Sequence, residues 1–511
     1  MRPWSLLMTS VLAIHLAGFP ASADDTKETP KAAEKGKADE KDDDKLIVTQ
    51  HETKIGEESI KYRATAGLMP LHDASDKVEA RMFFVAYTVD TKEDQPRRPL
   101  MFAFNGGPGS SSVWLHLGAL GPKCVVVPVD PTIPPPPYRL TENAQSWLDK
   151  TDLVFIDPVE TGYSRAIKPE LNKKFHGLQG DIASVSEFIR MYLTRYERWT
   201  SPLYLVGESY GTTRAAGLAG HLADKGIALN GVILISTVLD FQTIGFGRAN
   251  ELTYSLFVPS FAATAWYHKK LPADLQGLGL PELVTEVTKW AEGDYLAALG
   301  KGDRLPDEER TTMIKRLARY TGLSERFVDL NDLRIPQHLF SKELLRDERK
   351  SVGRFDSRYL GFVGNAGSPS PEFDPSEAAV RPAYTATFNQ YVRTELNFKT
   401  DAPYHILGGG QIGAWDWGAP GIGYPETGSA LREAMGKNPH LKVLVASGYL
   451  DLATPFAATD YSLAHLKLAS ALRKNVQVTT YEAGHMMYLH GPSLIKLKRD
   501  AAQFIDDSDG R

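Results

Sequence analysis

The sequence predicts an α/β fold, with a mostly parallel central sheet flanked by helices and a mainly helical cap insertion. Two observations support the sheet. Short apolar runs indicate buried strands, and stretches of helical periodicity separate several of them, which is the pattern of βαβ units. The runs cover residues 99–105, 152–157, 203–207, 231–236, 442–448 and 476–482. The chain has 511 residues, 42% of them hydrophobic, which is enough to bury a large core.

The first 45 residues are not expected to belong to the fold. Residues 1–23 have the pattern of a secretory signal peptide, because Arg2 precedes an apolar run that ends in Ala-Ser-Ala at residues 21–23. A membrane anchor is the alternative, but the run is short for a span. Residues 24–45 are highly charged and nearly devoid of apolar side chains, which predicts a disordered linker. We therefore expect a secreted or periplasmic protein without a membrane span after signal cleavage.

The rest of the chain divides into a core in two parts and an insertion. Residues 46–239 form the first part, which begins with alternating, strand-like segments up to about residue 90. An amphipathic helix follows the second apolar run, with apolar positions at helical spacing from Ile182 to Tyr196. Residues 240–438 lose the strand signal and predict a helical cap. Residues 439–511 complete the core.

Composition excludes several classes of function. The formal net charge of −5 gives no indication of nucleic-acid binding. Cys124 is the only cysteine, so no intrachain disulfide can form, and the thirteen histidines lack ligand spacing. We therefore expect no metal site. The sequence carries no signal for an oligomeric state.

Ser209 lies between two glycines at the end of the third apolar run. The segment LYLVGESYG places the G-x-S-x-G pattern (Gly207, Ser209, Gly211) between a predicted strand and a predicted helix. This is the context of a nucleophile elbow, a tight strand-to-helix turn where flanking side chains would collide. The N–H groups of the following helix would face negative charge that develops beside the serine. Ser209 is therefore the candidate nucleophile.

A serine hydroxyl needs a base, and the base needs an acid that orients it. Asp451 lies in the loop after run 442–448, and His485 lies in the loop after run 476–482. Active sites of α/β sheets lie at the carboxyl ends of the strands, and Ser, Asp, His is the order found in this type of fold. Taken singly, Asp451 could be a turn residue and His485 a packed one. Together and in order, the three predict a catalytic triad.

The segment FAFNGGPGSSSVW, residues 102–114, directly follows the first strand of the parallel set. Its two adjacent glycines can bring a backbone N–H to the serine, which is the usual place for the second oxyanion donor. A plain Gly-Pro turn is the alternative.

Five motifs together resemble those of the serine carboxypeptidase family of α/β-hydrolases. They are NGGPGSSS, DPVETGYS, GESYG, GYLDLATP and AGHMMY. The resemblance covers residues 99–236 and 441–489, is loose in the cap, and is closest to a bacterial type of member. It implies an enzyme that needs no cofactor and releases C-terminal amino acids from peptides with a free C-terminus. It also implies an acyl-enzyme on Ser209.

The resemblance implies a role for each candidate residue. Ser209, Asp451 and His485 match the nucleophile, the orienting acid and the base. The backbone N–H groups of Gly107 and Tyr210 match the oxyanion hole.

The resemblance also implies that Asn105, Gly106 and Glu208 hold the C-terminal carboxylate of the substrate. Two carboxylates repel each other, so we expect one of them to be protonated, which makes a carboxyl–carboxylate hydrogen bond possible. Activity would then favour acidic pH and would be limited at low pH by protonation of His485. A purely structural hydrogen bond of Glu208 at the elbow is the alternative.

The sequence departs from the family pattern at two positions. Ser110 stands where members usually have a cysteine, and Ala119 stands where they usually have a second glutamate that pairs with the one before the serine. Without that partner, we expect the pKa of Glu208 to be raised less, which puts the acidic optimum in doubt. The disulfides of eukaryotic members are absent as well.

Two other functions stay open. An esterase or acyltransferase of the same fold would share the triad, and only Asn105 and Glu208 favour the peptidase over it. A secreted, non-catalytic binding protein could keep the fold, but the complete triad argues against it.

Overall fold

The computed structural model describes residues 46–90, 97–408, 415–418 and 423–509, which belong to one compact unit. The predicted signal peptide, residues 1–23, and the predicted linker, residues 24–45, lie outside the described residues. Among the helices that the structure describes, none is long and apolar enough to cross a bilayer.

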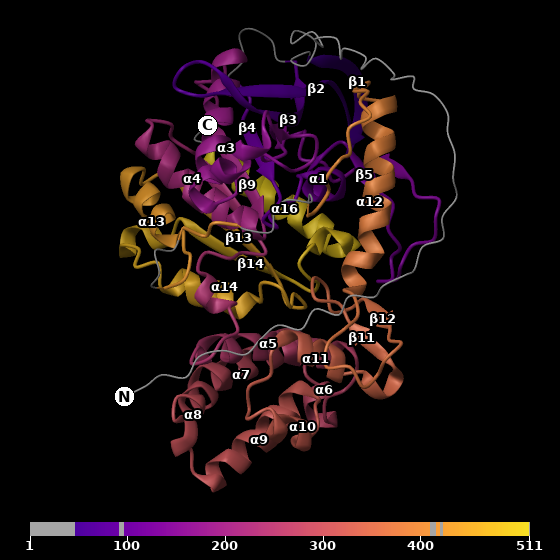
Figure 1. Ribbon diagram of the computed structural model, residues 1–511, viewed down its shortest axis with the longest axis vertical. Coiled ribbons are helices and arrows are strands. Elements are labelled where there is room, and N and C mark those ends of the chain that lie inside the picture. Colours follow the sequence, from indigo (N-terminus) through magenta and orange to yellow (C-terminus); the bar gives the residue numbers. More distant parts are fainter. Residues whose placement is uncertain (1–45, 91–96, 409–414, 419–422, 510–511) are drawn as a thin grey trace, which may run out of the picture. The chain divides into compact units, whose positions relative to one another are not determined.

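The six predicted apolar strands lie side by side in one sheet, in the order β7-β4-β9-β10-β13-β14. Figure 1 labels four of them, β4, β9, β13 and β14. Each strand is parallel to its neighbours within this set. Their bounds are Leu100–Phe104 (β4), Asp152–Ile156 (β7), Leu203–Glu208 (β9), Gly231–Ile235 (β10), Lys442–Gly448 (β13) and Val476–Tyr481 (β14). The predicted mostly parallel sheet is thus confirmed, and the carboxyl ends of all six strands meet at one edge.

Antiparallel strands extend the sheet beyond β7. The alternating segment near the start of the described chain forms β1, β2 and β3, which pair in sequence order, and β3 pairs antiparallel with β7. The bounds are Ile47–Ile55 (β1), Glu58–His72 (β2), Val78–Val89 (β3) and Arg165–Ala166 (β8), the last pairing with β3. A separate pair consists of Lys123–Val125 (β5) and Leu140–Glu142 (β6).

Alternate residues of the strands face two hydrophobic cores on opposite faces of the sheet. Along β4, Met101 and Ala103 belong to one core, whereas Leu100 and Phe102 belong to the other. The first core also receives α1 (Val113–Leu115), η1 (His116–Leu120), α12 (Pro375–Thr394), η7 (Met487–Leu489) and α16 (Gly491–Ser508). The second receives α2 (Asn172–Phe175), α3 (Leu178–Arg195), α4 (Tyr210–Asp224) and α13 (Gly428–Lys437). Helix α3 confirms the predicted amphipathic helix.

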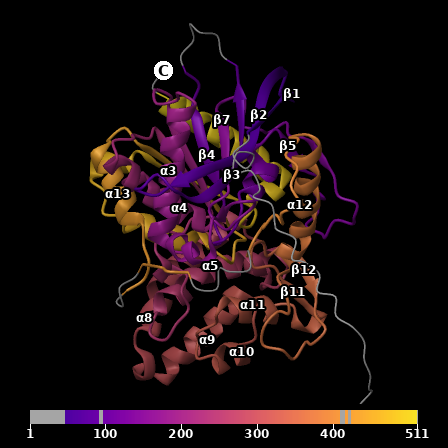
Figure 2. The same cartoon turned by 45° about the horizontal axis from the view of Figure 1, so that its top comes forward.

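The helices between β10 and α12 have a core of their own. They are α5 (Glu251–Tyr267), α6 (Ala273–Gln276), α7 (Leu280–Trp290), α8 (Leu296–Leu299), α9 (Asp307–Thr321), α10 (Glu325–Leu330) and α11 (Gln337–Glu343). Figures 1 and 2 both show α8, α9, α10 and α11 grouped apart from the sheet. A short hairpin follows them, made of β11 (Lys350–Val352) and β12 (Leu360–Phe362). After β13 come α14 (Phe456–Ala464) and α15 (Ser470–Arg473).

The boundaries predicted for the insertion, residues 240–438, stay a prediction. Two helices inside that range pack against the sheet rather than in the helical core. Phe388 and Tyr391 of α12 lie in one core of the sheet, and Leu431 and Met435 of α13 lie in the other. The apolar faces of these two helices therefore complete the layers on either side of the sheet.

Candidate active site

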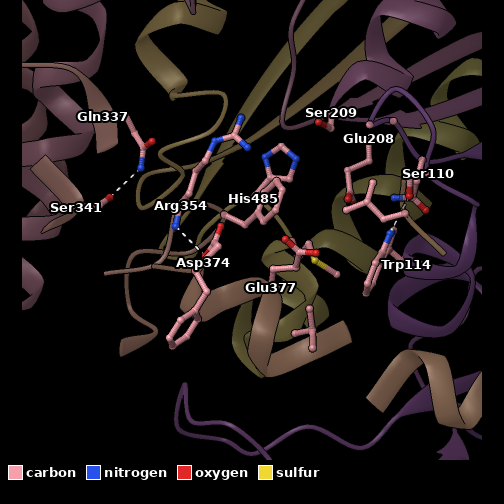
Figure 3. Close-up of a pocket in the computed structure, with 18 of the residues that line it drawn as sticks. Ser110, Trp114, Glu208, Ser209, Gln337, Ser341, Arg354, Asp374, Glu377 and His485 are labelled. Carbon is pink, nitrogen blue, oxygen red and sulfur yellow. Dashed lines mark hydrogen bonds between the residues drawn. The ribbon is translucent and has the colours of Figure 1, made fainter. Parts of the chain in front are cut away.

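The carboxyl edge of the parallel strands borders a cavity of about 490 Å3 (Figure 3). It is lined from two sides: by the loops that follow β4, β9 and β14, and by the segment around β11 and the start of α12. Six of the eight predicted site residues line it: Asn105, Gly106, Gly107, Glu208, Ser209 and His485. The other two, Tyr210 and Asp451, are buried directly behind this lining.

Ser209 occupies a strained turn between β9 and α4. Its φ and ψ of 61° and −132° lie in a region that residues other than glycine rarely adopt. The turn is held by the Ser209 N–H, which donates to the Ile235 carbonyl at 3.0 Å. A side chain at Gly207 would overlap the backbone of Gly211, and a Cβ at Gly211 would lie 2.8 Å from the Phe104 carbonyl oxygen, so both glycines of the motif are required. This is the geometry of a nucleophile elbow.

Asp451 and His485 form a buried pair. The Asp451 Oδ2 lies 2.8 Å from His485 Nδ1, and it also accepts a hydrogen bond of 2.8 Å from the Thr454 hydroxyl. The other oxygen, Oδ1, accepts the N–H groups of Ala453 and Thr454 at 2.7 and 3.0 Å. Because each carboxylate oxygen has two hydrogen-bond partners, the Asp451 side chain is held in one orientation. It therefore favours the imidazole tautomer with a proton on Nδ1 and leaves Nε2 as the acceptor.

Two effects act on the pKa of the His485 imidazole. Burial alone would lower this pKa, but the negative charge and hydrogen bond of Asp451, together with the charge of Glu208, outweigh burial. The net result is a pKa above the ordinary value of 6.5. The ring also packs on Phe355, with 5.1 Å between the ring centroids.

Ser209 and His485 share the cavity but are not hydrogen-bonded to each other within the part of the chain that the structure describes. In Figure 3 the His485 ring stands between Arg354 on one side and Ser209 and Glu208 on the other. Hydrogen bonds between a nucleophile and its base are often long without substrate and tighten when substrate binds.

The glycines after β4 pack directly on the elbow. A Cβ at Gly106 would be 2.7 Å from the backbone nitrogen of Gly211 and even closer to that of Tyr210. The next residue, Gly107, is thereby held at the start of α4, where Tyr210 has its N–H group. Gly107 lines the same cavity as Ser209, and the role of its N–H and that of Tyr210 as an oxyanion hole stays a prediction.

Glu208 is buried next to Ser209, with 3% of its surface exposed. Burial raises the pKa of its carboxyl to about 7. The charge of His485 and the neighbouring polar groups of Tyr488 and Asn105 oppose this rise, and the charge of Asp451 adds to it. The pKa of Glu208 is therefore raised although Ala119 supplies no partner carboxyl.

The two departures from the family pattern are both buried. The Ser110 hydroxyl accepts the indole N–H of Trp114 at 2.9 Å, so this position has a defined polar role without a thiol. Ala119 lies in the short π-helix η1 and is fully buried in the core that the sheet shares with α12 and α16.

Sequence reasoning missed a buried ion pair behind the site. Arg214 on α4 donates to Asp181 Oδ2 at 2.8 Å and to the carbonyl oxygen of Asn105 at 2.6 Å. The Tyr210 hydroxyl donates to the same carboxylate oxygen at 3.1 Å. Two charged residues on the apolar faces of predicted helices were the available signal. The pair fixes Asn105 relative to the elbow.

Sequence reasoning also missed the segment between β11 and β12, which contacts the loop of His485. The Asp356 Oδ2 accepts the Gly484 N–H at 3.2 Å and pairs with Arg358 at 2.6 Å. The Phe355 carbonyl accepts the His485 N–H at 2.6 Å. Residues of the insertion therefore hold the loop that carries His485. Such contacts between distant segments have no signature in the local sequence.

Comparison with known proteins gives one family. Residues 56–256 match the family described as serine carboxypeptidase. Serine carboxypeptidase-like 8 of Arabidopsis thaliana is 28% identical over 196 residues, which are 37% of this chain and 42% of that protein. The pheromone-processing carboxypeptidase KEX1 of Saccharomyces cerevisiae is 32% identical over 156 residues, 28% of this chain and 20% of that protein. The matches thus span about two-fifths or less of these two relatives.

A solved structure extends the likeness to the whole fold. The crystal structure titled as KEX1, a prohormone-processing carboxypeptidase from Saccharomyces cerevisiae, aligns with a TM-score of 0.56. The alignment covers 87% of this chain and 92% of that chain at 18% sequence identity. Together with the strand order, this confirms the predicted α/β-hydrolase fold.

Proposed function

We propose that this chain, a relative of the serine carboxypeptidases, is itself a serine-type carboxypeptidase that releases C-terminal amino acids from peptides. The observation that carries the proposal is Glu208. A glutamate with 3% exposure and a pKa of about 7 lines the same cavity as the candidate nucleophile next to it in sequence. Ester hydrolysis does not require such a group, whereas a protonated carboxyl at this place can donate a hydrogen bond to a free carboxylate.

The proposed reaction begins with attack of the Ser209 hydroxyl on the carbonyl carbon of the last peptide bond. His485 Nε2 takes the hydroxyl proton, while Asp451 holds the imidazole through Nδ1 and stabilises the imidazolium. The oxyanion is stabilised by the backbone N–H groups of Gly107 and Tyr210. Collapse breaks the C–N bond, and the imidazolium gives its proton to the leaving amino group.

Water completes the cycle. His485 takes a proton from a water molecule that attacks the acyl ester on Ser209, and the shortened peptide leaves with a new carboxyl group. The 2.8 Å contact between Asp451 and His485 supports this assignment, because the base must stay oriented through both steps. No step in this sequence uses a metal ion or an organic cofactor.

Recognition of the substrate is proposed to depend on the protonation state of Glu208. Below a pH of about 7 its carboxyl is protonated and can donate a hydrogen bond to the substrate carboxylate. The Asn105 amide and the Gly106 N–H are the proposed further donors. Above that pH, a charged Glu208 would repel the substrate.

The test compares N-blocked dipeptides with a free C-terminus and their C-terminal amides, between pH 4 and pH 8. We expect the purified protein to release the last residue from the acid only, and Ser209→Ala to abolish release. Equal cleavage of acid and amide, or cleavage of esters alone, would favour an esterase or acyltransferase. Failure of an active-site serine reagent to label Ser209 would favour a non-catalytic binding protein.

We also propose that residues 1–23 are a signal peptide and that the protein is secreted or periplasmic. The support is the apolar run followed by Ala-Ser-Ala at residues 21–23. Mass spectrometry of the protein recovered outside the cytoplasm should give an N-terminus at Asp24. An intact Met1 in that fraction would contradict the proposal.

A further inference from the structure

Glu208 has an unexpected neighbour. Tyr488 lies in the turn η7, three residues after His485, and is 2% exposed. Its hydroxyl and the amide of Asn105 are the two polar groups that act on the Glu208 carboxyl as hydrogen-bonding neighbours. Within the described residues, Asn105 Nδ2, Glu208 Oε2 and Tyr488 OH all lack a partner at ordinary hydrogen-bond distance. Three buried polar atoms, on side chains that act on one another, are thus left without a partner.

The backbone around Gly118 makes room for this tyrosine. A Cβ at Gly118 would be 2.7 Å from Tyr488 Cδ2 and 2.6 Å from the Tyr384 hydroxyl. Gly118 and the small Ala119 both belong to η1, which packs against η7. A side chain at Gly118 would therefore overlap the Tyr488 ring.

We propose that Tyr488 is a positioning residue for Glu208: its hydroxyl supports the carboxyl from behind and directs it into the cavity. This inference rests on the proposed function, because it concerns how the substrate carboxylate is recognised. Tyr488 does not line the cavity, whereas Asn105 and Glu208 do, so the tyrosine acts through Glu208 rather than on substrate.

A hydroxyl and a carboxyl behave differently in this position. Burial raises the pKa of Tyr488 well above 10, so it stays a neutral donor at every working pH. A second carboxyl would compete with Glu208 for one proton, which a hydroxyl does not do. The hydroxyl instead favours the charged form of Glu208, so its removal should raise the pKa of Glu208 further. The other titratable groups that act on Glu208 are His485 and Asp451, and Tyr384 also interacts with it.

The first test is enzymatic and uses Tyr488→Phe, with Tyr384→Phe as the matched control. Both lose one buried hydroxyl beside Gly118, but only Tyr488 acts on Glu208 as a hydrogen-bonding neighbour. For Tyr488→Phe we expect KM for the free acid to rise about threefold to tenfold, the equivalent of one hydrogen bond. The alkaline limit of acid hydrolysis should move up by as much as about one pH unit. Hydrolysis of a matched ester should stay within about twofold, which also shows that the variant is folded.

The second test needs no substrate and therefore separates failure of this inference from failure of the proposed function. Infrared difference spectroscopy follows the carbonyl stretch of the protonated Glu208 carboxyl during a pH titration, with Glu208→Gln to assign the band. We expect the midpoint to rise in Tyr488→Phe and to stay unchanged in Tyr384→Phe. An unchanged midpoint in Tyr488→Phe, or an equal shift in both variants, would overturn the positioning role even if the protein proves to be a carboxypeptidase.

Discussion

The backbone N–H of His485 donates a hydrogen bond to the carbonyl of Phe355, 2.6 Å away. The candidate base therefore depends on a residue that lies more than a hundred positions earlier in the chain, between β11 and β12. A second contact of the same kind joins the Leu452 N–H to the Arg354 carbonyl at 3.0 Å. The insertion thus supports the loops of both Asp451 and His485, in addition to lining the cavity.

Asp356→Ala should damage both stability and turnover. The change removes the acceptor of the Gly484 N–H and leaves Arg358 buried without its carboxylate. Loss of one partner of a buried ion pair costs about 3–5 kcal/mol in the free energy of unfolding. Urea denaturation measures this loss, and ester hydrolysis by the remaining folded protein should show a lower kcat.

A matched control exists for this variant. Asp329 pairs with Arg310 at the surface, where its side chain is 51% exposed. Asp329→Ala should change the free energy of unfolding by less than about 1 kcal/mol. Equal losses of unfolding free energy in the two variants would show that the contact of Asp356 with the His485 loop stabilises the fold no more than a surface ion pair does.

Arg214→Lys tests the support of Asn105. Lysine keeps the charge but has no planar fork, so it cannot bond Asp181 and the Asn105 carbonyl as arginine does. We expect KM for free-acid substrates to rise more than kcat falls, because Asn105 belongs to the proposed carboxylate site. Steady-state kinetics on an acid and its matched ester would check this. If only kcat fell, and fell for both the acid and the ester, Arg214 would support the nucleophile elbow and not the carboxylate site.

The parallel strands and the candidate triad could be predicted because each has a local signature. Buried parallel strands are continuous apolar runs, and the loops that follow them contain Ser209, Asp451 and His485. The structure places Asp451 and His485 in contact, although 34 residues separate them in the chain. Strand order and loop position were sufficient for this step.

The supporting residues could not be predicted, because their roles arise only from tertiary packing. Tyr488 lies in a short turn with no periodicity, and its neighbour Gly118 belongs to a different core turn. Asp356 lies between β11 and β12, in a part of the insertion where the sequence offers no motif. At Glu208, burial is the largest cause of a pKa of about 7, and the extent of that burial follows from tertiary packing rather than from the residue at position 119.

Asp451→Asn should abolish most catalysis while leaving the fold intact. An asparagine amide cannot accept from His485 Nδ1–H and from the Thr454 hydroxyl as the carboxylate does. The imidazole would then lose the tautomer that leaves Nε2 free. By analogy with other Ser-His-Asp enzymes, kcat for ester hydrolysis should fall by about 10⁴-fold. Thermal unfolding should confirm that the variant is folded. A loss below tenfold would indicate that Asp451 does not orient the base.

The pH dependence of stability tests whether Glu208 is buried as a protonated group. Its carboxyl has an ordinary pKa of 4.5 in the unfolded chain and about 7 in the fold, so the unfolded chain releases this proton first. Glu208 therefore destabilises the fold progressively as pH rises from 4.5 to 7. The full effect corresponds to about 3 kcal/mol.

Glu208→Gln removes this titration and keeps the shape of the side chain. The free energy of unfolding of the variant, relative to the original protein, should increase by about 3 kcal/mol between pH 4 and pH 8. Urea denaturation at both pH values measures the change, and Ser209→Ala, which adds or removes no titrating group, should give a constant difference. If the Glu208→Gln difference were also constant with pH, the carboxyl would titrate normally. Recognition of the substrate carboxylate by a protonated Glu208 would then lose its physical basis.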